Sequence, residues 1–130
     1  MTNDEFRIYH ANIIEQYQFI EHDLEGIFGL LEKGDFEELT RRVENDTMGE
    51  LIRKVRFLCK EYNISYLSKD DFNMLEHIRN DRNFWCHECY LDIFKNNELF
   101  DDISIRLKND YRTAYSMNKK LRETFKTLNK

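Results

Sequence analysis

Apolar residues recur every three or four positions along most of this 130-residue chain. The first stripe covers residues 3–33, and its members are Phe6, His10, Ile13, Tyr17, Ile20, Leu24, Ile27 and Leu31. This spacing places apolar side chains on one face of an α-helix. Similar stripes cover residues 47–62, 68–95 and 98–128, and no segment shows the two-residue alternation of a strand. The pattern therefore predicts four long helices.

Helix start signals agree with these stripes. Four residues that suit an N-cap are each followed three positions later by an acidic residue: Thr2, Asp35, Thr47 and Ser68. Asp35 opens a short extra segment, and residues 63–67 form the expected loop. Gly26 and Gly29, within the first stripe, either let a neighbouring element approach closely or only weaken the helix locally. We predict an all-α, up-and-down four-helix bundle with an additional short helix, as a single domain over residues 1–130.

Composition narrows the class of protein. Hydrophobic residues make up 41% of the chain and charged residues 35%, which is typical of a folded domain and far from a disordered one. No apolar run approaches the ~20 residues of a membrane-spanning helix, and the N-terminus lacks a signal-peptide pattern. Three cysteines without a secretion signal favour reduced thiols, so we expect a cytoplasmic protein that does not contact the membrane.

Charge is unevenly distributed along the chain. The net charge of −5 argues against a general nucleic-acid coat, whose affinity comes mostly from a basic surface. Residues 1–50 nevertheless hold thirteen acidic and four basic residues, whereas residues 103–130 hold two acidic and eight basic ones. Such polarity either attracts a phosphate chain to one side of the molecule or reflects ordinary solvated helix faces.

The most informative segment covers residues 78–87, which read IRNDRNFWCH. Arg82 falls within the apolar stripe of its helix, where a guanidinium needs a partner or a bound anion. That partner is either a carboxylate, from Asp81, Glu76 or the first helix, or an anionic ligand. A ligand-free ion pair would make Arg82 a purely structural residue.

A polar ridge lies beside this stripe, formed at helical spacing by Asn80, Asn83, His87 and Tyr90. The arginine fork matches two phosphate oxygens at once, and an imidazole can transfer protons near neutral pH. These groups suffice to cleave RNA without a metal: a 2′-hydroxyl attacks the adjacent phosphorus, the imidazole moves the proton, and the guanidinium stabilises the developing charge. Alternatively, the histidine only makes a hydrogen bond in the core.

Arg82-Asn83-Phe84-Trp85-Cys86-His87 resembles the R-x4–6-H motif of the HEPN superfamily, in which a polar residue, often Asn, follows the arginine. The resemblance covers six residues in sequence and the whole chain in architecture, with the motif on the third long helix of a four-helix bundle. Many HEPN proteins are metal-independent endoribonucleases of toxin–antitoxin, abortive-infection and other anti-phage systems. They form homodimers in which two motifs face each other in one cleft.

The resemblance implies a role for each motif residue. Arg82 would bind and stabilise the scissile phosphate, His87 would act as general acid or base, and Asn83 would orient them. Arg79 lies too far from His87 to be the motif arginine, so we expect it to be an accessory RNA contact, with Asn80 and Tyr90 as further RNA-binding residues. No cofactor or metal is expected, and an antitoxin or other regulatory protein is an expected partner.

The chain also departs from the family pattern. In one toxin subgroup a tyrosine stands two residues after the histidine and is modified by the antitoxin, whereas Cys89 holds that position here. That regulation is not carried over. Some HEPN domains lack nuclease activity and serve as dimerising or RNA-holding modules, and such a non-catalytic module is the main alternative. An acidic immunity or antitoxin protein that binds a basic partner is a third interpretation.

The Cys86-x-x-Cys89 pair supports other chemistry only weakly. A structural zinc site needs a second pair of ligands, and His77 could supply one only by reaching across almost three helical turns. Thioredoxin-like redox chemistry would need a preceding strand. Cys89 is better interpreted as a small core residue, and Trp85 as part of the core or of a dimer interface.

Overall fold

The chain folds into α-helices without strands, as described for all of residues 1–130 by a computed structural model. The elements are α1 (Asn3–Leu31), α2 (Phe36–Val43), α3 (Met48–Glu61), α4 (Lys69–His87), α5 (Cys89–Lys95), the single 3-10 turn η1 (Asn97–Leu99) and α6 (Phe100–Leu128). The all-α helical bundle is thus confirmed, with two short α-helices instead of one. No helix has the combination of length and apolar character that a membrane crossing requires.

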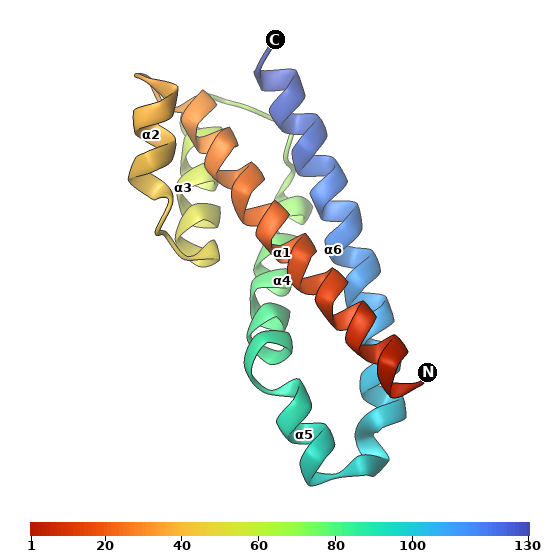
Figure 1. Ribbon diagram of the computed structural model, residues 1–130. Coiled ribbons are helices and arrows are strands. Elements are labelled where there is room, and N and C mark those ends of the chain that lie inside the picture. Colours follow the sequence, from red (N-terminus) through yellow and green to blue (C-terminus); the bar gives the residue numbers. More distant parts are fainter.

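Helix α1 lies at the centre of the bundle. It contacts α2, α3 and α4, and it packs most extensively against α6. Figure 1 shows α1 and α6 running side by side in the same direction, with α4 running the opposite way. Because α2 returns the chain between α1 and α3, these two helices run in the same direction. The predicted up-and-down alternation of helix directions therefore holds only when the short helix α2 is counted. The two termini therefore lie at opposite ends of the molecule (Figure 1).

All four predicted N-caps are present. Thr2 and Ser68 each form a capping box with the acidic residue three positions later, and the side chains of Asp35 and Thr47 accept backbone N–H groups of the first turn. These bonds satisfy N–H groups that a helix cannot pair internally. The predicted stripe of α1 is buried except at His10, which is half-buried. The N-terminal boundaries of α1 to α4 therefore follow directly from the sequence, and so do the residues of α1 that face the core.

The two glycines of α1 allow close packing, as one of the two interpretations predicted. A Cβ atom built on Gly26 would lie 2.8 Å from the ring of Phe125, and one on Gly29 would lie 2.7 Å from Thr40 Cγ2 and 2.8 Å from the Phe36 ring. Real Cβ atoms do not approach other atoms so closely. The glycines thus bring α2 and the end of α6 directly onto the backbone of α1.

The prediction of one continuous helix from residue 68 to about residue 95 is wrong. Helix α4 ends at His87, and Glu88 (φ −123°) separates it from α5. The carbonyl of Trp85, which a continuous helix would pair with the N–H of Cys89, accepts a hydrogen bond of 2.6 Å from His10 Nε2. A side chain that inserts into the helical hydrogen-bond ladder is a recognised cause of a kink. This contact from α1 is not visible in a periodicity pattern.

Candidate functional site

The motif occupies the last two turns of α4, beside the middle of α1. Arg82 Nη2 lies 3.0 Å from Glu21 Oε1 of α1, and 37% of the arginine side chain is exposed. The contact is an ion pair that is not aligned as a hydrogen bond, since Glu21 Oε1 has no hydrogen-bond partner. The sequence offered an unspecified acid of the first helix as one possible partner of Arg82, and Glu21 is that acid. The guanidinium is therefore held at the surface by a single carboxylate.

The expectation that Arg82 lies within the buried stripe needs correction. The buried residue at this level of α4 is Asp81, and the inward-facing series runs Phe72, Leu75, Ile78, Asp81 and Trp85. Steps of three and four residues are equally compatible with either position, so the spacing could not distinguish them. A long arginine side chain reaches solvent from the edge of the stripe, whereas the short Asp81 side chain finds partners on α6.

Two groups next to Arg82 have pKa values that burial raises and that the positive charge of the arginine opposes. Burial raises the pKa of Glu21, and the positive charge of Arg82 partly offsets that rise. Burial also raises the pKa of the Cys86 thiol, again with an opposing effect from Arg82. A thiol with a raised pKa stays protonated and is a poor nucleophile or metal ligand. The arginine is thus the chemically dominant group here.

His87 is the last residue of α4, and its side chain is exposed. It makes no hydrogen bond or ion pair within the chain, and none joins it to Arg82. Asn83 and Asn80, one and two turns earlier on the same face, are also exposed and have no side-chain hydrogen bond. The structure therefore provides three of the four residues of the predicted polar ridge as unpaired, solvent-facing groups.

The accessory residues Arg79 and Tyr90 are placed differently. Arg79 Nε pairs with Glu76 at 2.9 Å, and the arginine side chain is 39% exposed. Tyr90 lies beyond the helix break on α5, so it does not continue the ridge of α4. Its ring packs edge-on against His10, with ring centroids 4.9 Å apart, and against Phe6. Burial raises the pKa of its phenol.

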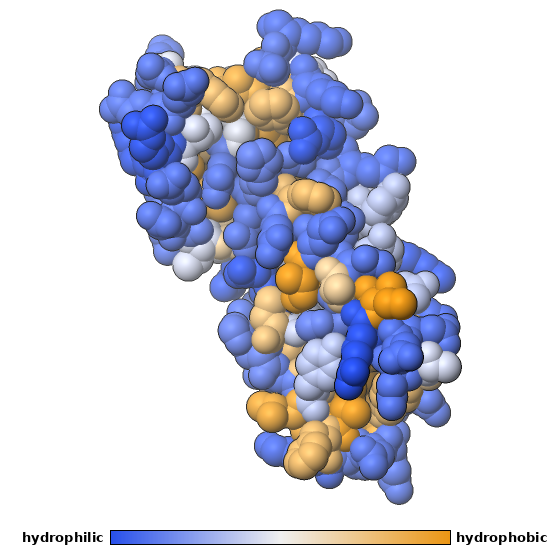
Figure 2. Space-filling view, in the orientation of Figure 1, coloured by the Kyte–Doolittle hydropathy of each residue, from blue (hydrophilic) through white to orange (hydrophobic).

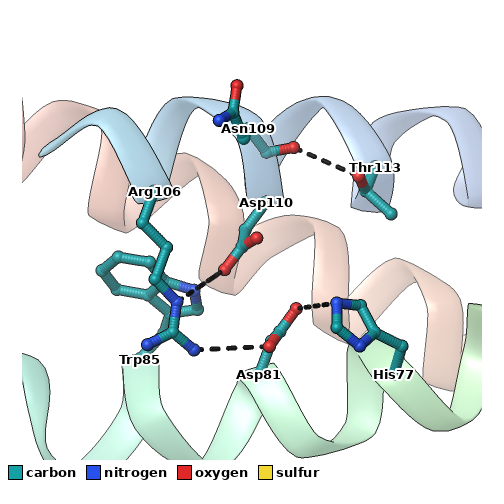
Figure 3. A network of polar contacts seen from close by, with 7 residues as sticks. All are labelled: His77, Asp81, Trp85, Arg106, Asn109, Asp110 and Thr113. Carbon is teal, nitrogen blue, oxygen red and sulfur yellow. Dashed lines mark hydrogen bonds and ion pairs between the residues drawn. The ribbon is translucent and has the colours of Figure 1, made fainter. Parts of the chain in front are cut away.

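A denser polar network joins α4 to α6 (Figure 3). Arg106 contacts Asp81 through Nη2 and Asp110 through Nε, both at 3.3 Å. Asp81 also lies 3.4 Å from His77, while Asp110 accepts a 2.9 Å hydrogen bond from Trp85 Nε1. One cation thus bridges two carboxylates, and it also stacks over the Phe84 ring at 4.0 Å. This arrangement holds the face of α4 that carries Asp81 and Trp85 against α6.

Sequence reasoning did not identify this network as a unit. The signals available were two four-residue spacings, that of Arg106 and Asp110 on one helix and that of His77 and Asp81 on another. Desolvation raises the pKa of Asp81, helped by the nearby negative charge of Asp110 and opposed by His77 and Arg106. Beneath the network, the buried hydroxyl of Tyr17 has no hydrogen-bond partner. Its pKa is raised by burial and by the charges of Asp110 and Asp81.

The cysteines are free thiols. Cys89 is buried, as predicted, and its Sγ lies 3.5 Å from the Trp85 carbonyl, whereas Cys86 is exposed. Trp85 is 1% exposed and belongs to the core, which selects one of the two interpretations of that residue. No group of three or more histidine, cysteine, aspartate or glutamate residues is placed to hold a metal ion.

No protein-family model matches the chain, and comparisons with curated proteins and with solved structures give no match. The resemblance to HEPN proteins therefore depends on residues 82–87 and on the helical architecture.

Proposed function

We propose that this protein is a metal-independent endoribonuclease of toxin or anti-phage (abortive-infection) type. Arg82 binds and stabilises the scissile phosphate, His87 transfers protons, and Asn83 orients the substrate or the two catalytic groups. Arg79, Asn80 and Tyr90 provide accessory RNA contacts. The active species is a cytoplasmic homodimer with the motif at the dimer cleft, restrained by an antitoxin or regulatory protein.

The observation that carries this proposal is the partial exposure of Arg82. Only Nη2 of its guanidinium contacts Glu21, so the remaining N–H donors have no partner within the chain. A guanidinium that offers two adjacent donors can bind a phosphate bidentately. RNA can therefore bind at this edge of α4 without unpacking the core.

The placement of His87 supports the second chemical role. It lies five residues after Arg82, about 7.5 Å further along the helix axis, and its imidazole faces solvent. The attacking 2′-oxygen forms a bond to phosphorus while the bond from phosphorus to the 5′-oxygen breaks. An imidazole next to the phosphate can take the proton from the 2′-hydroxyl or deliver one to the 5′-oxygen. The second imidazole of a dimer would serve the other of these two steps.

Apolar residues directly after the motif support the dimer. On α5, Leu91 is 58% exposed and Phe94 is 85% exposed. In Figure 2, apolar side chains gather at the end of the molecule that carries α5, and further apolar surface lies in the middle and at the opposite end of this face. Large exposed apolar side chains that cluster usually mark an interaction surface. A second copy bound there would bring the two His87 residues toward each other.

A non-catalytic dimerising or RNA-binding module is the second candidate. The Arg82–Glu21 ion pair favours it, because this contact also ties α4 to α1 and gives Arg82 a structural task. The net charge of −5 also limits the affinity for RNA that the surface as a whole can supply.

An assay of RNA cleavage by the purified protein in excess EDTA distinguishes the endoribonuclease from the non-catalytic module. We expect the parent protein to cleave, and both Arg82→Ala and His87→Ala to reduce the rate by about 100-fold or more. Arg112→Ala is the matched control for the guanidinium, because Arg112 is exposed on α6, which carries none of the motif residues. His77→Ala is the control for the imidazole, because His77 is exposed on α4 and its one ionic contact is with Asp81. Circular dichroism checks that every variant folds.

Each outcome separates the candidates. RNA binding without cleavage at high enzyme excess in all proteins would favour the module. Cleavage that EDTA abolishes would contradict the metal-independent mechanism. Cleavage that survives in both Arg82→Ala and His87→Ala would show that the motif is not the active site.

A further inference from the structure

A hollow of about 460 Å³ lies between α1, α2 and the C-terminal part of α6, at the opposite end of the molecule from α5. Figure 2 shows apolar surface at this end, between α2 and α6, surrounded by hydrophilic residues. Pockets that bind small ligands commonly have volumes of about 300–1,000 Å³, with apolar walls and a few polar groups. This hollow combines both kinds of lining.

Its apolar wall consists of Phe36 from α2 and Phe125 from α6. The centroids of the two rings lie 6.5 Å apart at an interplanar angle of 52°. Both rings rest on the backbone of α1 at Gly29 and Gly26, where a Cβ atom would displace them. The glycines therefore shape this wall, which offers a ligand the faces of two fixed aromatic rings.

Asp23 lines the same hollow and is 2% exposed. Its Oδ1 lies 2.9 Å from Arg122 Nη2, whereas its buried Oδ2 has no hydrogen-bond partner. Burial raises the pKa of Asp23, opposed by the positive charges of Arg122 and His22. An unsatisfied buried carboxylate oxygen is costly, and a donor that pairs with it recovers that cost.

The charged residues around the hollow favour a ligand with a positive charge. Three further carboxylates line it (Glu25, Glu37 and Glu44), against two arginines (Arg41 and Arg122). This excess of negative charge would repel an anionic ligand. Arg122 is 46% exposed, so its head group can turn toward solvent and leave Asp23 to a competing cation.

We propose that this hollow binds an organic cation with a guanidinium or amidinium head. The head pairs with both oxygens of Asp23 in place of Arg122, and a flat or alkyl body packs on Phe36 and Phe125. Planar, bidentate pairing is the geometry that a carboxylate offers to such a head. The cation is either a free small molecule or an arginine side chain of a partner protein.

Binding of benzamidine to the full chain tests this, measured by NMR chemical-shift perturbation and calorimetry. Benzyl alcohol and benzoate are the neutral and anionic comparisons. We expect Asp23→Asn to weaken binding about tenfold or more, because it removes a charged pairing. Arg122→Gln should tighten binding, because it removes the internal competitor. Asp71→Asn, which breaks the separate Asp71–Lys120 pair between α4 and α6, is the matched control and should have no effect.

The outcomes are distinct. The absence of benzamidine binding at millimolar concentration, equal binding of benzyl alcohol, or unchanged affinity in Asp23→Asn would each overturn the proposal. If Asp23→Asn does not fold, the double variant Glu37→Gln, Glu44→Gln replaces it and should weaken binding severalfold. Unchanged affinity in that double variant would also overturn the proposal. Argininamide and a blocked arginine-containing peptide then separate the two sources, since a protein ligand predicts much tighter binding of the peptide.

Discussion

Arg82 is held at the surface by Glu21, a residue sixty-one positions earlier in the chain and on a different helix. The sequence showed that a guanidinium near an apolar stripe needs an anionic partner, and the partner exists. It did not show which of Asp81 and Arg82 faces inward, because both fit a helical stripe. That choice depends on Arg106, which reaches Asp81 from α6. Long-range partners of this kind are absent from local spacing.

Glu21 should compete with RNA for Arg82. Replacing it as Glu21→Gln removes a negative charge next to the proposed phosphate position, so we expect tighter binding of single-stranded RNA, by about threefold to tenfold. Fluorescence anisotropy at low and high salt measures the effect, which should shrink as salt increases. Glu15→Gln, an exposed glutamate on the same helix, is the matched control. Equal affinities of the parent and Glu21→Gln for RNA would show that no RNA phosphate binds next to Arg82.

At the scale of elements, the four helix starts with a side-chain cap were predictable, and the break between α4 and α5 was not. N-caps such as Thr2 and Ser68 act within one turn, so their signal is complete in the local sequence. The end of α4 at His87 depends on a hydrogen bond from His10, seventy-five residues before Trp85. This break separates Tyr90 from the polar ridge and directs α5 away from the α4 axis (Figure 1). The break thereby leaves His87 at a helix end.

The close packing of α2 on α1 gives a stability prediction. Gly29→Ala should lower the free energy of unfolding by about 1–3 kcal/mol, because the new methyl group would collide with Thr40 and Phe36. Gly49→Ala is the matched control: its methyl group meets only the movable side chains of Arg79 and Arg53, so the gain in helix propensity of up to about 1 kcal/mol should dominate. Urea unfolding followed by circular dichroism measures both. A Gly29→Ala protein as stable as the parent would contradict the packing described here.

At the scale of the whole molecule, the fold brings the acidic and basic parts of the sequence together. Helix α6, which carries most of the basic C-terminal residues, lies beside the acidic α1. Arg122 pairs with Asp23 of α1, while Arg106 and Lys120 pair with aspartates of α4. The charge separation along the chain is thus partly cancelled by pairing in space. Charge counts along a sequence cannot reveal this, because they contain no information on which helices become neighbours.

The exposed apolar side chains of α5 give a prediction about assembly. We expect the parent to dimerise and Phe94→Glu to raise the dissociation constant of the dimer by about tenfold or more, because a charge would be buried in an apolar contact. Phe57→Glu is the matched control, since Phe57 is 64% exposed but lies on α3. Sedimentation equilibrium distinguishes the species. A monomeric parent, or a dimer that Phe94→Glu leaves intact, would rule out α5 as the interface.

The most direct test of the proposed chemistry is the identity of the RNA ends that the parent protein produces in excess EDTA. Attack by the 2′-hydroxyl, assisted by Arg82 and His87, predicts one product with a 2′,3′-cyclic phosphate and one with a free 5′-hydroxyl. Mass spectrometry of a defined oligonucleotide detects both ends. Products with a 5′-phosphate would show that water, and not the 2′-hydroxyl, attacks the phosphorus, and would contradict the proposed mechanism.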